Sequence, residues 1–321
     1  MKILVPVDYS KGSDNACKFA IELARDMKAE MVLMHSFEST LLYSSMPLLT
    51  VQLDYAHIYQ SELRKLKDYY KKITKLSKGV KVELNMQHGI AAVRIPEVAR
   101  EMKAGLIIMG TTGKGALART IIGSNTLKTI QDAPCLVLAI PLKSGYKKLR
   151  KIVYASDLTE SNIMHATRIV PFIGKFKGEI MLLNVDNKAV VTTEADYEKI
   201  RVKIRELVKY KNISAFVLED KNVAAGIHSF IEKHKADCLA VYTHHRGFIE
   251  GLFSTSMARK LSLHVKVPLL VIHEDDAPVI PLRKLEVGKS KKATKKVTKK
   301  VVKSVPKKSR GKSGKKQGNK S

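Results

Sequence analysis

The stretch LIIMGTTG at residues 106–113 decides the fold of this chain, and the pair Gly123-Ser124 follows it after nine further residues. Its apolar start predicts a short buried strand. A glycine at a strand end lets the backbone approach a ligand without hindrance from a Cβ atom, and a Gly-Ser pair that opens a helix presents free N–H groups. The spacing G-x2-G-x9-G-S is neither the Walker loop nor the dinucleotide fingerprint G-x-G-x-x-G. We therefore predict a phosphate-binding loop of another kind.

The chain repeats itself with a period of about 140 residues, too long for a solenoid repeat. The segment KILVPVDYS at residues 2–10 aligns with KIVYASDLT at residues 151–159, and both are apolar runs that end in Asp and a hydroxyl residue. Near the end of each half, APCLVLAI at residues 133–140 matches KVPLLVI at residues 266–272. The repeat indicates duplicated domains.

Short apolar strands alternate in each half with stretches of helical period, which predicts an α/β fold of two tandem open parallel-sheet, Rossmann-like domains. Ligands of such sheets bind beyond the carboxyl ends of the strands, where Asp8 and Gly110 fall. We place the domains at residues 1–142 and 149–275, joined by a short linker at residues 143–148. The expected strands are Ile3–Val7, Met31–His35, Val80–Gln87, Leu106–Met109, Cys135–Ile140, Ile152–Ala155, Ile180–Val185, Ser214–Leu218, Cys238–Tyr242 and Leu269–Ile272. The expected helices of the first half are Ala16–Met27, Tyr55–Leu76, Ile95–Met102 and Asn125–Gln131.

The positive charge of the chain is concentrated at its end. From Val279 onward, 17 Lys and Arg residues stand against the single acid Glu286, which accounts for +16 of the net charge of +28. This segment, residues 279–321, has too little apolar surface to order itself, so we expect a disordered tail. Residues 283–320 are suited to non-specific contact with nucleic acid through phosphates. A polycation beside the ribosome and association with an anionic membrane are the alternatives.

The compartment expected from the sequence is the cytoplasm, with the nucleoid or the ribosome as sites of association. The sequence has no apolar run long enough for a transmembrane helix, and it begins like a strand, not like a signal peptide. Three scattered cysteines, Cys17, Cys135 and Cys238, do not form a disulfide or metal-binding pattern.

Four motifs of the first half occur together in one known family. They are VPVD at residues 5–8, LMH at residues 33–35, the glycine motif, and APCLVL at residues 133–138. With these motifs the chain resembles the universal stress protein family, in its tandem-domain type, over roughly residues 1–275 and with a lysine-rich C-terminal extension. Ala104-Gly105 departs from the Ala-Asp that the family usually has there, whereas Ala236-Asp237 keeps it.

The resemblance implies that the first half binds ATP, accompanied by Mg²⁺. Asp8 would read the ribose or adenine side, the backbone at Ser36 would flank the adenine, and Lys114 and Arg119 would add positive charge near the phosphates. A turn that serves only the fold is the alternative reading of the glycines. The implied binding residues are Pro6, Val7, Asp8, Ser36, Met109, Gly110, Gly113, Gly123, Ser124 and Asn125.

The second half has lost the glycine motif. We expect Thr243 in the place of the first glycine and Arg246 in that of the second, with Thr255-Ser256 replacing the Gly-Ser pair, and hence no ATP there. The alternative is that Arg246, with Ser254 and Ser256, binds a different anion.

Two histidine features are assigned no catalytic or metal-binding role. His35 is expected to be a packed or hydrogen-bonded core residue, not a catalytic base. His244-His245 is not expected to bind a metal, because neighbours on a strand point apart and no third ligand follows at a recognised spacing.

The function expected is nucleotide-dependent signalling or protection under stress. ATP hydrolysis is expected to be slow at most, because no general base is positioned beside a γ-phosphate site, and no pattern of a catalytic nucleophile appears. The last strands of the two halves are expected to pair antiparallel within the chain, with a further homodimer left open. The apolar segment at residues 41–51 is expected to pack on the following helix, with a lid or a partner surface as the alternatives. The rival function is a nucleic-acid-coating protein whose folded domains are a scaffold. An adenylating enzyme on a related fold is disfavoured, because its phosphate signatures are absent.

Overall fold

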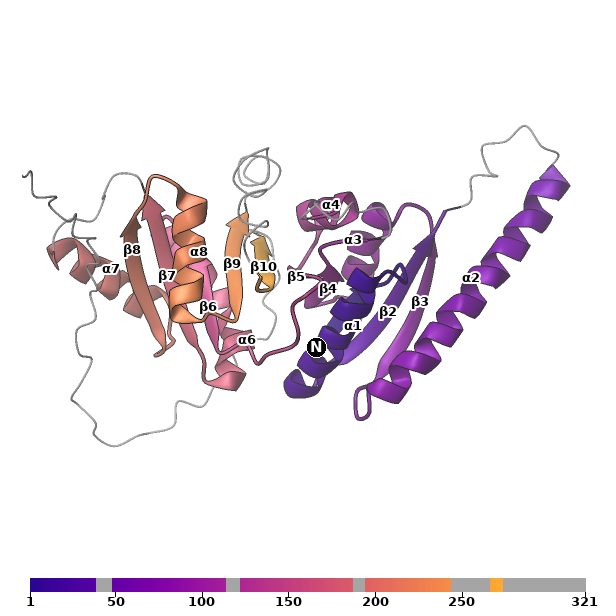
Figure 1. Ribbon diagram of the computed structural model, residues 1–321, viewed down its shortest axis with the longest axis horizontal. Helices are drawn as coiled ribbons and strands as arrows, with labels where there is room; N and C mark the ends of the chain where they lie inside the picture. Colours follow the sequence, from indigo (N-terminus) through magenta and orange to yellow (C-terminus); the bar gives the residue numbers. More distant parts are fainter. Residues whose placement is uncertain (39–47, 114–121, 187–193, 244–265, 274–321) are drawn as a thin grey trace, which may run out of the picture. The chain divides into compact units, whose positions relative to one another are not determined.

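The computed structural model describes residues 1–38, 48–113, 122–186, 194–243 and 266–273. These residues form one ten-stranded sheet with the order β3-β2-β1-β4-β5-β10-β9-β6-β7-β8, in which each half supplies five parallel strands (Figure 1). The α/β prediction with parallel sheets is confirmed. The strands are β1 (Lys2–Pro6), β2 (Glu30–Phe37), β3 (Val82–His88), β4 (Leu106–Gly110), β5 (Leu136–Ile140), β6 (Lys151–Ala155), β7 (Glu179–Asp186), β8 (Ile213–Glu219), β9 (Cys238–Thr243) and β10 (Leu269–His273).

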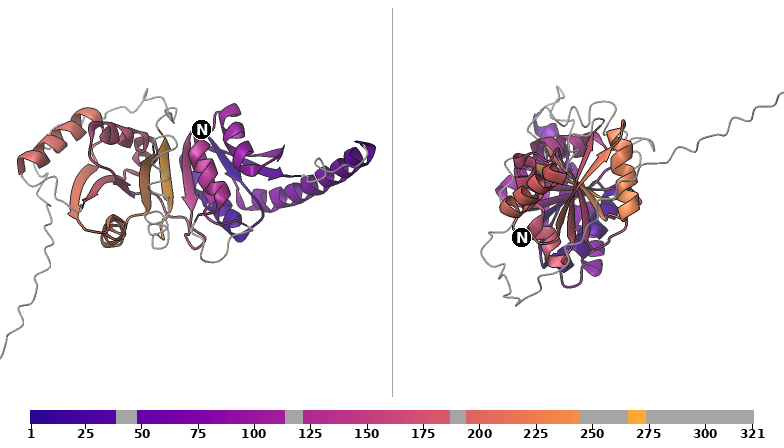
Figure 2. Two further views of the ribbon diagram at one scale, coloured as in Figure 1. Left: turned by 90° about the horizontal axis from the view of Figure 1, so that it is seen from above. Right: turned by 90° about the vertical axis from the view of Figure 1, so that its left-hand side faces the viewer.

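The helices lie on both faces of this sheet (Figure 2). One face carries α1 and α2 in the first half and α5, α6 and α7 in the second, and the other face carries α3, α4 and α8. Among the described residues, no helix is long and apolar enough to cross a membrane. The helices are α1 (Lys11–Met27), α2 (Leu48–Leu76), α3 (Ala91–Glu101), α4 (Ser124–Asp132), α5 (Glu160–His165), α6 (Val170–Ile173), α7 (Glu194–Leu207) and α8 (Val223–His234).

All four helices predicted for the first half begin earlier than the apolar pattern predicts, α1 and α2 by the most. Helix α1 starts at Lys11 because the Ser10 side chain caps it, accepting a hydrogen bond from the Ser13 N–H at 3.1 Å. Helix α2 starts at Leu48, so the end of the apolar segment at residues 41–51 is helical and is not a loop. Residues 39–47, on which the rest of that expectation falls, lie outside the described residues.

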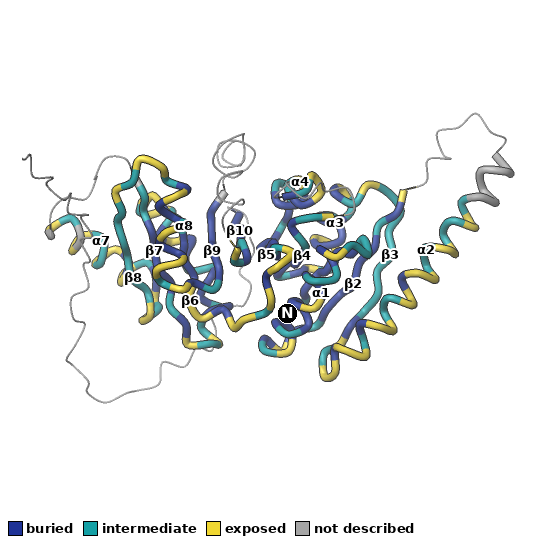
Figure 3. The backbone as a smooth tube through the Cα atoms, in the orientation of Figure 1, coloured by how far each residue is buried: buried dark blue, intermediate teal, exposed yellow. Residues whose placement is uncertain are grey.

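The core consists of two apolar layers, one on each face of the sheet. Ile3 and Val5 point into the layer under α1, and Leu4 between them points into the layer under α3. The central strands are buried on both faces, whereas β3 and β8 at the two edges are half-buried (Figure 3). This is the burial that a parallel sheet covered on both faces requires.

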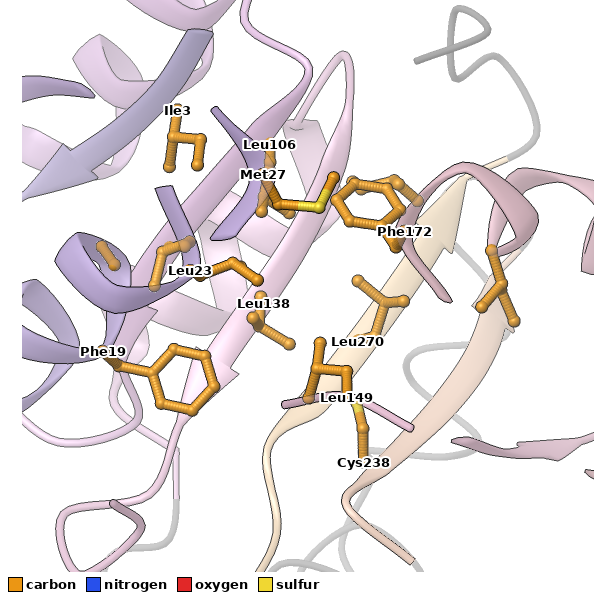
Figure 4. Close-up of a cluster of buried hydrophobic side chains, with 14 of the residues drawn as sticks. Ile3, Phe19, Leu23, Met27, Leu106, Leu138, Leu149, Phe172, Cys238 and Leu270 are labelled. Carbon is orange, nitrogen blue, oxygen red and sulfur yellow. The ribbon is translucent and has the colours of Figure 1, made fainter. Parts of the chain in front are cut away.

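The two halves join through antiparallel pairing of β5 with β10, as the sequence predicts. Ile107 and Leu239 hold equivalent places, because they pair with the equivalent residues Leu4 and Val153. The strands beside β4 and β9 are β5 and β10, and their register makes Leu138 of β5 equivalent to Leu270 of β10. These two residues pair with each other across the junction (Figure 4). A local pseudo-twofold axis therefore passes through the Leu138–Leu270 pair.

Candidate functional site

The carboxyl ends of β1 and β4 bring the predicted acid and the glycine motif together. Asp8 follows β1, and Gly113 lies just past the end of β4, the neighbouring strand. A Cβ atom at Gly113 would lie 2.8 Å from Oδ2 of Asp8. The Asp8 carboxylate therefore lies against the backbone of the second glycine.

A tight turn fixes the other carboxylate oxygen of Asp8. The Ser10 N–H donates a hydrogen bond to Asp8 Oδ1 at 3.0 Å, and Tyr9 between them has a left-handed φ of 63°. The second half repeats this turn, since the Thr159 N–H donates to Asp157 Oδ1 at 2.9 Å and Leu158 has φ 61°. The turn is thus part of the fold in both halves, and Asp8 becomes a site residue only through its position beside Gly113.

Gly110 has a role in packing that the sequence does not reveal. A Cβ atom at Gly110 would lie 2.7 Å from the carbonyl oxygen of Gly12, and one at Gly12 would lie 2.0 Å from the carbonyl oxygen of Thr112. The first turn of α1 therefore rests directly on the end of β4. This contact brings the two glycines together from distant parts of the chain, so neither has a local signal for it.

Gly123 is in a different situation, because the fold itself has room for a side chain there. Its φ of −69° and ψ of 156° suit any residue, and a Cβ atom would lie 3.6 Å from the Thr111 carbonyl oxygen, an ordinary contact. The Gly123 N–H donates a hydrogen bond to that carbonyl at 2.7 Å, which closes the loop. Among the described residues, a side chain at Gly123 would therefore meet no close obstacle.

Helix α4 starts at this loop with no side-chain cap from Gly123. The first N–H groups of a helix lack partners within it and carry partial positive charge, which suits phosphate. Ser124 and Asn125 are exposed there. Thr126, which lies outside the predicted motif, is 4% exposed and donates its hydroxyl to the Gly110 carbonyl at 2.9 Å. Thr126 thereby ties the start of α4 to the end of β4.

The strand ends beside Asp8 are held by a buried histidine. His35 is 6% exposed, with Nδ1 2.7 Å from the Val7 carbonyl oxygen and Nε2 3.3 Å from the carboxylate of Glu62 on α2. The prediction of a hydrogen-bonded core histidine is confirmed. Burial raises the pKa of Glu62, but the hydrogen bond from Lys65 and the charges of Lys65 and His35 outweigh this and hold it below its usual range.

The remaining predicted binding residues have buried or engaged side chains, so they would contact a ligand mainly through their backbone. Pro6, Val7 and Met109 are buried. Ser36 is half-buried on β2, and its hydroxyl donates to the Gly89 carbonyl oxygen at 2.5 Å, toward the edge of the sheet. The two strands that meet at the site are β1 and β4, while β2 contributes from the far side of β1.

The equivalent place in the second half is occupied by an aromatic side chain, and here one prediction is wrong. Strand register aligns Gly110 with Tyr242, not with Thr243, because Leu106 and Cys238 pair with the equivalent residues Ile3 and Ile152. The Tyr242 ring stacks on His165 with centroids 3.8 Å apart, and these residues are 4% and 8% exposed. The contact between glycine backbones in the first half is thus replaced by packed rings.

Several predictions fall on residues outside the described ones. These are the charges of Lys114 and Arg119, the pair His244-His245, Arg246 with its serines Ser254 and Ser256, and the Thr255-Ser256 replacement. Within the part of the chain that the structure describes, no group of three or more His, Cys, Asp or Glu residues is arranged to hold a metal ion.

Sequence comparisons place both halves of the chain near one family. The model of the universal stress protein family matches residues 1–141 and again residues 148–273. The chain is 34% identical over 143 residues to universal stress protein MJ0531 of Methanocaldococcus jannaschii, which covers 43% of this chain and 81% of the relative. It is 32% identical over 140 residues to a Staphylococcus epidermidis protein that carries the same family name, covering 43% of this chain and 82% of that relative.

Solved structures share the arrangement of both halves. The crystal structure of a universal stress protein from Archaeoglobus fulgidus aligns with a TM-score of 0.65 at 15% identity, covering 85% of this chain and 96% of the other. A structure from Pseudomonas aeruginosa aligns with a TM-score of 0.54 at 18% identity, covering 85% of this chain and 92% of the other. At such identities the similarity concerns the fold.

Proposed function

This chain belongs to the universal stress protein family, with one family domain in each half, and we propose that its first domain binds ATP while its second does not. The observation that carries the proposal is that the Asp8 carboxylate lies against the Gly113 backbone, while the uncapped start of α4 at Gly123 is bonded to Thr111, also just past the end of β4. An acceptor for a hydroxyl or base N–H therefore lies beside a phosphate-binding helix end.

The proposed roles follow from these positions. Asp8 accepts from a ribose hydroxyl or from the base through Oδ2, the oxygen that lies beside Gly113. The N–H groups of Gly113, Ser124 and Asn125 bind the phosphates, with Mg²⁺ balancing part of the triphosphate charge. The described residues leave room for a Cβ atom at Gly123, which supports a role for this glycine in admitting a ligand.

The second domain is proposed to bind no ATP. Tyr242 stands where Gly110 stands in the first domain, and its buried ring fills the place at which α1 meets β4 there.

We propose a role in stress signalling or protection, without committed catalysis. Asp8 is held by its turn and Ser124 lies at the exposed start of a helix, and we assign neither of them the role of a nucleophile or a general base. Hydrolysis of bound ATP is therefore expected to be slow. The cytoplasm is the proposed compartment, and the unbridged, buried thiols of Cys17, Cys135 and Cys238 suit it.

Calorimetric titration of ATP with Mg²⁺ into the full chain tests the nucleotide proposal. We expect one site per chain, lost in Gly123→Arg, because the arginine side chain would occupy the space beside the loop. Gly145→Arg is the matched control, since a Cβ atom at Gly145 meets nothing within 4 Å. Two sites per chain, or binding that Gly123→Arg leaves intact, would contradict the assignment.

For the tail, we propose sequence-independent contact with nucleic acid through residues 283–320, supported by the charge of +16 from Val279 onward. Deletion of residues 279–321 tests it, with retention on immobilised DNA at low salt as the measurement. Retention that survives the deletion unchanged would contradict the role of the tail. If the full chain binds no ATP and the deletion abolishes DNA retention, the rival function is favoured, in which the folded domains are a scaffold.

A further inference from the structure

A groove of about 450 Å³ lies at the amino ends of β6, β7 and β8 in the second domain, away from the strand ends equivalent to the ATP site. None of its lining residues is aromatic. It is lined by Arg150, Lys151, Lys177, Gly178, Glu179, Lys211, Asn212, Ile213 and Ser214.

The groove is strongly basic. Its four cations, Arg150, Lys151, Lys177 and Lys211, are exposed and face one acid, Glu179. Glu179 accepts a hydrogen bond from the Ser214 hydroxyl at 3.1 Å. The side chains of three of the cations form no ion pair with any described residue, and only the ammonium of Lys151 is engaged, with the His234 carbonyl oxygen at 3.2 Å. The lining therefore carries a formal charge of +3.

The floor of the groove is held by backbone contacts. A Cβ atom at Gly178 would lie 2.5 Å from the Arg150 carbonyl oxygen, so this part of the chain packs as closely as backbone allows. The Tyr210 hydroxyl donates to the Gly178 carbonyl at 2.7 Å, and the Asn212 amide donates to the Lys177 carbonyl at 3.3 Å. These bonds fix the positions from which the Lys177 and Lys211 side chains extend.

The first domain carries less positive charge at the equivalent place. Strand register aligns Glu179 with Glu30, Asn212 with Lys81 and Ser214 with Glu83. In the first domain the Lys81 ammonium lies 3.4 Å from Glu30 and 2.8 Å from Glu83, so that surface neutralises its own cation. Lys2 and Lys28 are the counterparts of Lys151 and Lys177, whereas Met1 and Val80 stand in the places of Arg150 and Lys211. The set of four cations is therefore found in the second domain, while two of them recur in the first.

We propose that this groove binds the phosphate backbone of nucleic acid. Adjacent strands are about 4.8 Å apart, so the cations before β6, β7 and β8 span about 10 Å. Phosphates of one strand follow each other every 3.4 Å or so along a duplex, which places about three of them within this span. Exposed lysines spread along an open groove suit such a row of charges better than one small anion, for which polar groups would converge.

The contact carries no sequence preference, because the groove offers neither an aromatic ring for stacking nor an element that enters a groove of the duplex. It is independent of ATP binding. It adds a folded contact to the one proposed for residues 283–320, and the two are separated by the measurements below.

The salt dependence of binding gives the first test. Fluorescence anisotropy with a labelled 30-base-pair duplex is measured for the full chain and for Lys177→Ala/Lys211→Ala. Loss of two phosphate contacts should reduce the slope of log K against log salt by about 1.8. The control is Lys28→Ala/Lys103→Ala, which removes the same charge from exposed positions of the first domain and should leave the slope unchanged. Equal slopes for both variants and the unmodified chain would overturn the proposal.

Lysine footprinting separates the groove from the tail in the full chain. Acetylation rates at single lysines are read by mass spectrometry with and without the duplex, and Lys177 and Lys211 should be protected severalfold while Lys28 and Lys103 are not. Protection confined to residues 283–320 would overturn the groove proposal and leave that of the tail intact. Equal protection by inorganic phosphate, at the same concentration of phosphate groups, would show a small-anion site and also overturn it.

Discussion

At the scale of single residues, Gly110 and Gly123 differ in what surrounds them. A Cβ atom at Gly110 would meet the Gly12 backbone at 2.7 Å, whereas one at Gly123 would be in ordinary contact at 3.6 Å. Glycine at position 110 is therefore required by helix packing, and glycine at position 123 leaves space that the fold does not use. The same motif combines a structural requirement with a proposed binding role.

This difference predicts opposite outcomes for two alanine variants. Gly110→Ala should lower the free energy of unfolding by about 1–3 kcal/mol, because backbone must shift to admit the methyl group. Gly123→Ala should leave it within about 0.5 kcal/mol of the unmodified chain but weaken ATP binding. Urea unfolding and calorimetry measure the two effects. Equal destabilisation by both variants would contradict the distinction.

The sequence predicted the positions of residues that follow directly from the order of the strands. It did not predict contacts that depend on how a helix packs on the sheet. Asp8 and Gly113 meet because both follow parallel neighbouring strands, which the apolar runs reveal. The Gly12–Gly110 contact depends on how α1 packs, and no local pattern records it. Tyr242 was missed because matching the polar residues after the strand suggested Thr243, whereas strand register decides the alignment.

At the scale of elements, Asp14 fastens α2 to α1. Its carboxylate accepts the Tyr69 hydroxyl at 2.9 Å and the Lys72 ammonium at 3.1 Å, and Lys18 lies 3.3 Å away. Burial raises the pKa of Asp14, but the hydrogen bonds from Lys72, Tyr69 and Lys18 outweigh it and hold this pKa below its usual range. The attachment of α2 is therefore strongest when Asp14 is ionised.

The stability that Asp14 contributes should depend on pH. Because its pKa is lower in the folded state, the contribution is fully present above the unfolded pKa of about 3.9 and is lost as the pH falls through the folded value. Asp14→Asn should cost about 1–3 kcal/mol at pH 7 and progressively less below pH 4. Urea unfolding at a series of pH values measures this.

The control for this experiment is Asp68→Asn. Asp68 pairs with Lys71 at 3.2 Å, but its side chain is 74% exposed, so its loss should change stability by less than about 0.5 kcal/mol at either pH. An Asp14→Asn effect that stays constant from pH 7 to pH 3 would contradict the role assigned to the ionised carboxylate.

The sequence predicted which segments form helices and strands, but it did not predict where α1 and α2 begin. The apolar periodicity of α1 begins at Ala16, while the Ser10 cap that starts the helix at Lys11 is a polar signal outside that pattern. Helix α2 extends back to Leu48 through a segment whose apolar composition suits several structures. The pairing of β5 with β10 was predictable, because the last strand of each half would otherwise be an edge strand with unpaired backbone N–H and C=O groups.

At the scale of the whole molecule, β5 and β10 make the two domains share one sheet and one apolar layer. Leu270 is 2% exposed in this layer, and Leu270→Ala should lower the free energy of unfolding by about 2–5 kcal/mol. Because the layer is shared, thermal unfolding should remain a single transition of both domains. Calorimetry and circular dichroism check this.

Leu142→Ala is the matched control, since Leu142 is 45% exposed next to the junction and should contribute little. Two well-separated transitions in the unmodified chain, or a Leu270→Ala effect as small as that of Leu142→Ala, would show that the domains unfold independently.

The pseudo-twofold axis at Leu138 and Leu270 has a consequence for how such a molecule diversifies. In an assembly of two identical chains, any substitution appears twice, so an aromatic residue at the first glycine would close both sites at once. When the two copies are joined in one chain, a substitution in one copy no longer appears in the other. One half can then acquire Tyr242 and a basic groove while its counterpart retains Gly110 and a less basic surface, so that the two halves of a symmetric fold differ in their sites.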